Sequence, residues 1–395
     1  MRRKSGYIRK RKEGLWEGQY VFQKQKCSIY GKSKEETKEA LERIMKSIED
    51  NIYIKPTKYT MTSWLKEWFK LYAKKTLRPS TFLNYESNID QHLIPYFGNM
   101  LLENVSTRKL QEFFNYKQSA GRCDKKPGGL SIKTLKNIKY LLHVAFDQAY
   151  YEHIIPQNPV EGVKLPVPEQ PEQSVMTSAE KDKLCEYAKQ IDSMAAKGVI
   201  ILLNCGLRKG ELLALQWQNI DLISDQIAIK KSLSRLKKFS AEDSAYKYIR
   251  VDKYAPKKNK TGLYLGPVKT KKANRRIYLP PSVREALLDI KKIHERYQAQ
   301  NIYQNSFDLV FCTETGRPYD PRTFETEYKE ILRGAQIREM KLHSTRHTFA
   351  TEAMQITNDI VTVADILGHA KPSTTLDMYG HTFDDRRRAL MAQFK

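Results

Sequence analysis

The sequence lacks several features that would assign it to common classes of protein. No apolar run reaches the roughly 18 residues that suggest a membrane-spanning helix, and no apolar stretch follows the basic start MRRKSGYIRKRK, as a secretory signal would require. The five cysteines are odd in number and far apart, which excludes a disulfide framework and a CxxC zinc site. We therefore expect a cytoplasmic protein with no membrane association.

Acidic residues are scarce beside basic ones. The chain has 69 Lys+Arg against 45 Asp+Glu, a formal net charge of +24 and a pI near 9.6. Such a surplus is typical of proteins that bind a polyanion, most simply nucleic acid, although a basic but otherwise ordinary protein is the alternative. No phosphate-cradling GxxxxGK[ST] loop and no metal-ligand spacing occur, so we expect neither a cofactor nor a metal.

The length of 395 residues predicts two or three domains, and the first is a small module at residues 1–55. Its aromatic residues lie in short alternating stretches that predict a three-stranded sheet. A helix should follow, with Ser33 and Glu36 at its start and apolar residues at Leu41, Ile44 and Ile48. Seven of the first twelve residues are Lys or Arg, and the aromatic alternation behind them favours a DNA-binding sheet over a solvated tail.

The rest of the chain divides at a proline-rich stretch. Residues 56–160 predict an all-helical domain whose aromatic stripes form its core. Lys133, Lys136 and Lys139 lie away from that core, as a phosphate-binding face or a merely solvated one. Residues 161–175 predict an extended linker, and residues 176–395 form the C-terminal domain.

Three short segments of the C-terminal domain carry polar residues suited to phosphate chemistry. They read NCGLRKGELLAL from Asn204, KLHSTRHTFAT from Lys341, and ILGHAKPSTTLDMYGH from Ile366. One HxxR motif alone has little value as a signal. Several such boxes in this order, with a short gap from histidine to tyrosine, are a specific pattern.

The order and spacing of these segments resemble the catalytic domain of tyrosine recombinases, the lambda-integrase-like family, over roughly residues 175–385. Arg208 matches the GLRxxE box, His343 and Arg346 the HxxR box and His369 the LGH box, and Tyr379 follows ten residues later. The N-terminal modules resemble, more weakly, the arm-binding and core-binding domains of integrases from phages and conjugative transposons. The expected fold is a multidomain α+β chain: a small N-terminal three-stranded sheet plus helix, an all-helical core-binding domain, and a mainly helical catalytic domain with a β-sheet or hairpin.

The resemblance implies a role for each matching residue. Tyr379 attacks the scissile phosphate and leaves a 3′-phosphotyrosine and a free 5′-hydroxyl. Arg208 and Arg346 clamp the non-bridging oxygens, because the phosphorane-like transition state carries extra negative charge. His343 accepts or positions the tyrosine proton, and His369 donates a hydrogen bond to the phosphate. Each residue alone has a structural explanation, as a cap or a core polar group, but the joint pattern favours an active site.

The family also uses a lysine on a β-hairpin as general acid for the leaving 5′-oxygen. The segment VKTKKANRRIYLP from Val268 resembles that hairpin; Lys269 is the best match, with Lys271 and Lys272 close by. The gap from Arg208 is longer than in minimal family members, and the excess predicts an inserted β element at residues 231–265. Residues 227–276 hold 16 Lys or Arg and 3 Asp or Glu, which favours DNA contact over a solvated hairpin.

The implied function is that of an integrase, which exchanges strands through a Holliday junction and so inserts and excises a mobile element. Its implied partners are double-stranded DNA at core and arm sites, a homotetramer on DNA, and an excisionase-type accessory protein. Within the tetramer, a tail at residues 381–395 would either contact a neighbour or fold back on its own domain. The phosphotyrosine conserves bond energy, so neither ATP nor a metal is required. A type IB topoisomerase and a non-catalytic DNA-binding protein are the alternatives.

Overall fold

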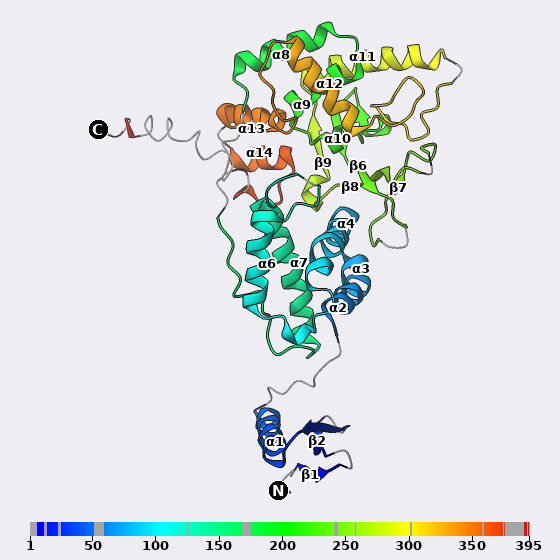
Figure 1. Cartoon of the computed structure of the whole chain (residues 1–395). Coiled ribbons are helices and arrows are strands. Elements are labelled where there is room, and N and C mark those ends of the chain that lie inside the picture. Colours follow the sequence, from blue (N-terminus) through cyan, green and yellow to red (C-terminus); the bar gives the residue numbers. More distant parts are fainter. Residues whose placement is uncertain are drawn as a thin grey trace. The chain divides into compact units, whose positions relative to one another are not determined.

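The computed structural model describes residues 6–11, 14–22, 25–50, 59–124, 126–167, 175–240, 244–256, 258–300, 302–357, 359–373, 375, 391–392 and 394. The chain divides into two compact units, Met1–Lys74 with Thr81–Glu169, and Lys75–Ser80 with Gln170–Lys395. Figure 1 shows the elements of both. None of the described helices is both long enough and apolar enough to span a bilayer.

The N-terminal module is an antiparallel sheet covered on one face by a helix, which confirms the predicted sheet and helix. The elements, in sheet order and then the helix, are β1 (Tyr7–Lys10), β2 (Trp16–Phe22), β3 (Gln25–Gly31) and α1 (Lys34–Glu49). Tyr20, Cys27 and Leu41 form the core between sheet and helix. The Ser33 side chain accepts a hydrogen bond from the Glu36 amide and so begins the helix as predicted.

The other face of this sheet is polar and aromatic. Strand alternation and register place Tyr7, Arg9, Glu17 and Tyr30 together on it. Glu17 is buried, and its carboxylate accepts hydrogen bonds from Arg9 and Arg11, each at 2.7 Å, which hold its pKa well below the ordinary range. Tyr7 and Tyr30 remain exposed. The face therefore combines guanidinium groups and aromatic rings around a single buried acid.

The helical part of the first unit follows, with a core of the predicted aromatic residues. Its elements are α2 (Met61–Trp68), π-helical η1 (Phe69–Ala73), α3 (Lys74–Thr76), α4 (Pro79–Asn88), π-helical η2 (Ile89–Leu93), α5 (Ile94–Phe97), 3₁₀ η3 (Leu102–Asn104), α6 (Thr107–Ala120) and α7 (Ile132–Tyr151). Trp64 is buried and donates a hydrogen bond to the Ala145 carbonyl at 3.0 Å. Of the lysine row, Lys133 and Lys136 are exposed, whereas Lys139 bonds the Val163 carbonyl.

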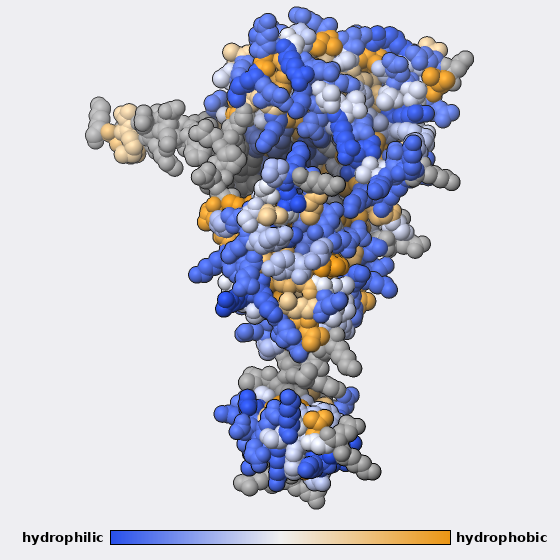
Figure 2. Space-filling view, viewed as in Figure 1, coloured by the Kyte–Doolittle hydropathy of each residue, from blue (hydrophilic) through white to orange (hydrophobic). Residues whose placement is uncertain are grey.

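The second unit is built around one fully buried helix, α9 (Met194–Cys205). The neighbours that pack against it are α8 (Ser178–Gln190), α11 (Pro281–Gln298), α12 (Pro321–Gly334) and α13 (Ser344–Thr357). Two further helices carry motif residues next to it, namely α10 (Lys209–Leu212) and α14 (Ile360–Leu367). This core holds in place the helix ends that carry the residues of the candidate site. In the face shown in Figure 2, the surface around these elements is mostly hydrophilic.

The strands of the second unit form two three-stranded antiparallel sheets. The strands are β4 (Ile220–Asp221), β5 (Gln226–Ile229), β6 (Lys231–Lys237), β7 (Ile249–Arg250), β8 (Thr261–Pro267) and β9 (Arg275–Tyr278). Their orders in the two sheets are β4-β5-β9 and β6-β8-β7. Strand β5 pairs with β9 and the adjoining β6 pairs with β8, so residues 268–274 bulge out between β8 and β9. We expected the segment around Lys269 to form a hairpin. The strands on either side of it, β8 and β9, instead pair with β6 and β5, and Lys269 lies in the bulge between them. The predicted β element at residues 231–265 contains β6, β7 and most of β8.

Candidate active site

Arg208 is placed by the turn that ends α9. Gly206 caps the helix with a φ of 60°, and a Cβ there would lie 2.4 Å from the Phe349 ring, so the position requires glycine. Arg208 then begins α10, where Glu211 accepts hydrogen bonds from the Arg208 backbone amide at 3.2 Å and from its guanidinium at 2.7 Å. Glu211 is buried, whereas the Arg208 side chain remains about one-third exposed (32%). The guanidinium is thus anchored at one edge and open to solvent at another.

Arg346 lies in the first turn of α13 and is buried. Its guanidinium donates to the carbonyl oxygens of Gly206 and Leu367, each at 2.7 Å. These carbonyls belong to the ends of α9 and α14, where unpaired oxygens carry partial negative charge. His343 directly precedes α13, and its carbonyl accepts a hydrogen bond from the Arg346 amide at 3.2 Å, so the two residues lie one turn apart at the start of the helix.

His369 follows the turn that ends α14. Gly368 adopts a φ of 68°, and the His369 amide donates back to the Ala364 carbonyl at 2.9 Å. The ring is buried, and its Nδ1 lies 2.8 Å from the Thr375 hydroxyl. When the hydroxyl donates, the ring proton stays on Nε2.

The electrostatics tie these side chains into one cluster. Burial and then the charges of Arg346 and Arg208 lower the pKa of His343; the same causes, followed by Arg275 and His343, lower the pKa of His369 to about 4. Burial, His343 and Arg346 hold the pKa of the neighbouring His347 at about 4. The structure therefore brings Arg208, His343, Arg346 and His369 together, with the histidines neutral at pH 7.

Two predicted site residues are not part of this arrangement as described. Lys269 is exposed, and within the described residues it makes no hydrogen bond or ion pair with the other four; Lys272 instead lies 3.8 Å from Asp365 of α14. Tyr379 falls in residues 376–390, outside the described part of the chain, as does most of the predicted tail at residues 381–395.

One buried residue next to the cluster was missed in the sequence. Arg275 of β9 has a side chain only 6% exposed and lies 3.1 Å from Glu211. It stands in the basic run KTKKANRR, where a lysine-rich and arginine-rich stretch suggested only a solvated or DNA-facing surface. The available signal was strand alternation, since Arg275 shares its face of β9 with the buried Ile277.

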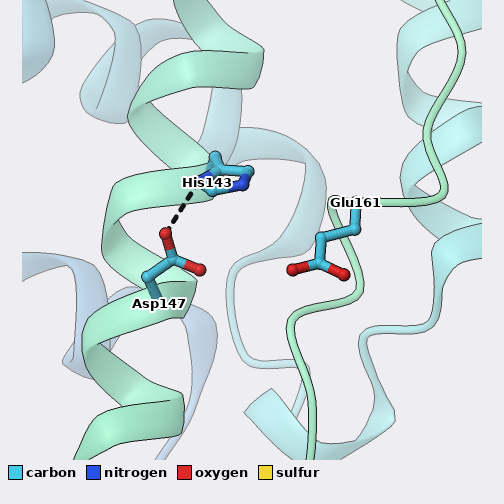
Figure 3. A group of neighbouring side chains, drawn as sticks. All are labelled: His143, Asp147 and Glu161. Atoms are coloured by element: carbon cyan, nitrogen blue, oxygen red, sulfur yellow. Dashed lines mark ion pairs between the residues drawn. The ribbon is translucent and has the colours of Figure 1, made fainter.

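Potential metal ligands gather at a different place, in the first unit. His143 and Asp147 on α7 and Glu161 on the following loop present ligand atoms within 4.8 Å of one another (Figure 3). His143 and Asp147 already form an ion pair at 2.8 Å, and Asn158 donates to Asp147 at 2.6 Å. These bonds give the cluster a structural explanation, because they connect the loop to α7.

Comparison with known families decides the assignment. A model of the Phage integrase family matches residues 174–386, and a model of the phage integrase N-terminal SAM-like domain matches residues 60–118. The chain belongs to the phage integrase family. The resemblance to tyrosine recombinases is thereby confirmed, and so is the expectation of an enzyme that transfers DNA strands.

Relatives of this recombinase match over most of their length. A tyrosine recombinase XerC-like protein of Caldanaerobacter subterraneus is 24% identical over 98% of this chain and 97% of its own. The transposase of transposon Tn916 from Enterococcus faecalis is 24% identical over 91% and 82%.

Solved structures show the same fold. The Tn1549 transposon integrase in complex with a circular intermediate DNA has a TM-score of 0.66 at 19% identity, covering 85% of this chain and 99% of that one. A lambda integrase tetramer bound to a Holliday junction has a TM-score of 0.55 at 16% identity, over 94% and 95%. The expected multidomain α+β fold is therefore confirmed.

We predict that acid destabilises the recombinase through its buried histidines. The pKa values of His347 and His369 are about 4 in the folded chain and return to about 6.5 on unfolding. The unfolded chain thus binds more protons between these values, and the free energy of unfolding falls as the pH drops from 6.5 toward 4, by about 3 kcal/mol at most for each histidine. Calorimetric melting at pH 7.5 and pH 5.5 measures the loss.

His347→Gln tests the source of that loss. The variant removes one of the two groups and should show a smaller decrease in melting temperature between the two pH values. His153→Gln, at an exposed histidine of the first unit, serves as the control and should behave like the unsubstituted protein. An equal pH dependence in all three proteins would contradict the assignment.

Proposed function

We propose that this recombinase cuts and rejoins specific DNA sites through a 3′-phosphotyrosine at Tyr379 and thereby inserts and excises a mobile element. The observation that carries the proposal is the convergence of Arg208, His343, Arg346 and His369 from separate segments onto one partly open cluster. Two guanidiniums beside two neutral imidazoles suit a reaction that adds negative charge to a phosphate while moving one proton.

Each proposed role follows from the state of the side chain. The Tyr379 oxygen forms a bond to phosphorus as the bond to the 5′-oxygen breaks. His343, kept neutral by burial and by its cationic neighbours, takes the tyrosine proton. Lys269 supplies a proton to the leaving oxygen, and His369 donates from Nε2 to a non-bridging oxygen. Attack by the 5′-hydroxyl of a partner strand reverses these steps, so two rounds form and resolve a Holliday junction without ATP.

Lys269 is proposed as the general acid because it is exposed in the bulge at residues 268–274. The backbone of this bulge is held on both sides by paired strands. The bulge begins and ends at strands paired to the continuous β5–β6 segment. Lys272 pairs with Asp365, which favours Lys269 over that alternative. Lys271 is also exposed and remains the competing candidate.

The DNA contacts are proposed to be separable. The open sheet face with Tyr7, Arg9 and Tyr30 would bind arm sites, and the exposed Lys133 and Lys136 of α7 would contact phosphates at core sites. The proposed boundaries are 1–55 for the arm-binding module, 56–160 for the core-binding domain, 161–175 for the linker and 176–395 for the catalytic domain. Further proposals are a homotetramer on DNA, an excisionase-type partner and a cytoplasmic location.

Strand exchange is favoured over topoisomerase-like relaxation. Relatives named as a tyrosine recombinase, an integrase and a transposase match 98%, 95% and 91% of this chain, and a match over 98% takes in nearly all of the N-terminal module. An enzyme that rejoined the same strand would need no separate arm-binding module. Exchange of strands between two duplexes distinguishes the two reactions.

We predict that Tyr379→Phe abolishes covalent capture while leaving DNA binding intact. The substitution removes only the hydroxyl, so the nucleophile is lost without a change of charge. The assay uses DNA nicked near the cleavage point, so that the short fragment with the free 5′-hydroxyl diffuses away and the adduct is trapped. Tyr278→Phe, at an exposed tyrosine of β9, is the matched control and should form adduct normally. Adduct formation by Tyr379→Phe would refute the nucleophile.

We predict that removal of residues 1–50 abolishes protection of a second, arm-type sequence but leaves cleavage at the core site intact. Fewer neutralised phosphates should also reduce the slope of affinity against salt. The comparison variant, Lys133→Ala with Lys136→Ala, should weaken core binding instead. Footprints of the three proteins decide it: identical sequence preference with and without residues 1–50 would rule out the arm-binding role.

A further inference from the structure

Arg275 is buried beside the cluster although no motif contains it. It begins β9, opposite Ile229 of β5, and its side chain is only 6% exposed. A buried guanidinium is costly unless its donors are satisfied. Its hydrogen-bond partners therefore show which parts of the structure this side chain connects.

The partners of Arg275 come from three segments. Nη2 donates to Glu211 at 3.1 Å, Nη1 donates to the Ala273 carbonyl at 3.0 Å, and Nε donates to the Ile366 carbonyl. Glu211 anchors Arg208, Ala273 ends the bulge that carries Lys269, and Ile366 lies just before the turn to His369. One planar group thus joins the supports of three proposed site residues.

Close packing reinforces these bonds at the turn before His369. A Cβ on Gly368 would lie 2.9 Å from the Ala273 Cα and 3.0 Å from Arg275 Nη1. The turn therefore sits directly on the arginine and on the backbone of the bulge. Any displacement of the Arg275 side chain changes the surface against which this turn rests.

The charges of the same group matter as well. The Glu211 carboxylate is shared between Arg208 and Arg275, at 2.7 Å and 3.1 Å. Two cations and one anion leave a positive surplus beside the place where a phosphate would bind. Without Arg275, Glu211 would neutralise Arg208 alone, and the surplus from this group would vanish.

We propose that Arg275 is a positioning residue for strand cleavage, which aligns the supports of Arg208, Lys269 and His369 and preserves the positive charge of Arg208 without touching DNA itself. The inference rests on the proposed function. A purely structural ion pair is the competing explanation, and it predicts that activity falls only as far as the folded fraction falls.

The test compares Arg275→Met and Arg275→Lys in the full-length protein with Arg333→Met. Arg333 is an exposed residue of α12 in the same unit, and its substitution removes the same charge. DNA affinity, melting temperature and the single-turnover rate of adduct formation are measured on nicked core-site DNA, and the pKa of His369 is measured by NMR.

Arg275→Met should bind DNA within roughly twofold of the unsubstituted protein but form adduct about 100-fold more slowly, the scale expected for misplaced reacting groups. The pKa of His369, followed by NMR of its ring, should rise, because Arg275 is among the charges, after burial, Arg346 and Arg208, that lower it. Arg275→Lys keeps the charge but not the planar fork of donors, so its rate should stay low with an unchanged His369 pKa. Arg333→Met should cleave normally.

Four results overturn or redirect the proposal. A normal rate and a normal His369 pKa in Arg275→Met would refute it. Loss of cleavage matched by equal loss of folded protein would leave only the structural ion pair; if the Met variant fails to fold, a normal rate in Arg275→Lys refutes the positioning role. If the unsubstituted protein forms no adduct while still binding DNA, the proposed function itself fails, and the role of Arg275 with it.

Discussion

The candidate site depends on the burial of the Arg346 guanidinium between two helix ends. Its donors bind the carbonyl oxygens of Gly206 and Leu367, so the charge faces the partial negative ends of α9 and α14. These two bonds hold the guanidinium in place with neutral partners. This arrangement fixes the distance between the motif that starts at Asn204 and the motif that starts at Ile366. Each of them begins at a helix end to which Arg346 donates a hydrogen bond.

The protonation of the histidines follows from this constraint. Burial together with Arg346 and Arg208 lowers the pKa of His343 and of His369, so both rings are neutral where an acceptor and an oriented donor are useful. Thr375 then orients His369 through Nδ1. Glu211 has a complementary role: it anchors Arg208 while Arg275 balances its charge, so an acid lies beside the site without cancelling it. The same few hydrogen bonds therefore determine both the positions of the site residues and the charge of the site.

Much of this was predictable from the sequence, because its signals are local. The αL glycines at Gly206 and Gly368 stand next to the polar residues they position, and the apolar spacing of the helices is regular. The sheet and helix of residues 7–49 followed from alternation and an N-cap. Features that depend on distant pairing were not predictable. The bulge around Lys269 arises because β8 and β9 pair with two different strands, β6 and β5, and the Arg275 side chain is buried because β9 pairs with β5 in this register. Residues 376–390 lie outside the described structure, so Tyr379 rests on its motif alone.

The central claim is that this cluster serves a covalent reaction of Tyr379 with a DNA 3′-phosphate. The most direct measurement is mass spectrometry of the adduct trapped on nicked DNA, after digestion of both the protein and the DNA. The account predicts a single modified peptide that carries a nucleotide 3′-phosphate on Tyr379, and a free 5′-hydroxyl on the released strand. A nucleotide on any other residue, or linkage through a 5′-phosphate, would contradict it.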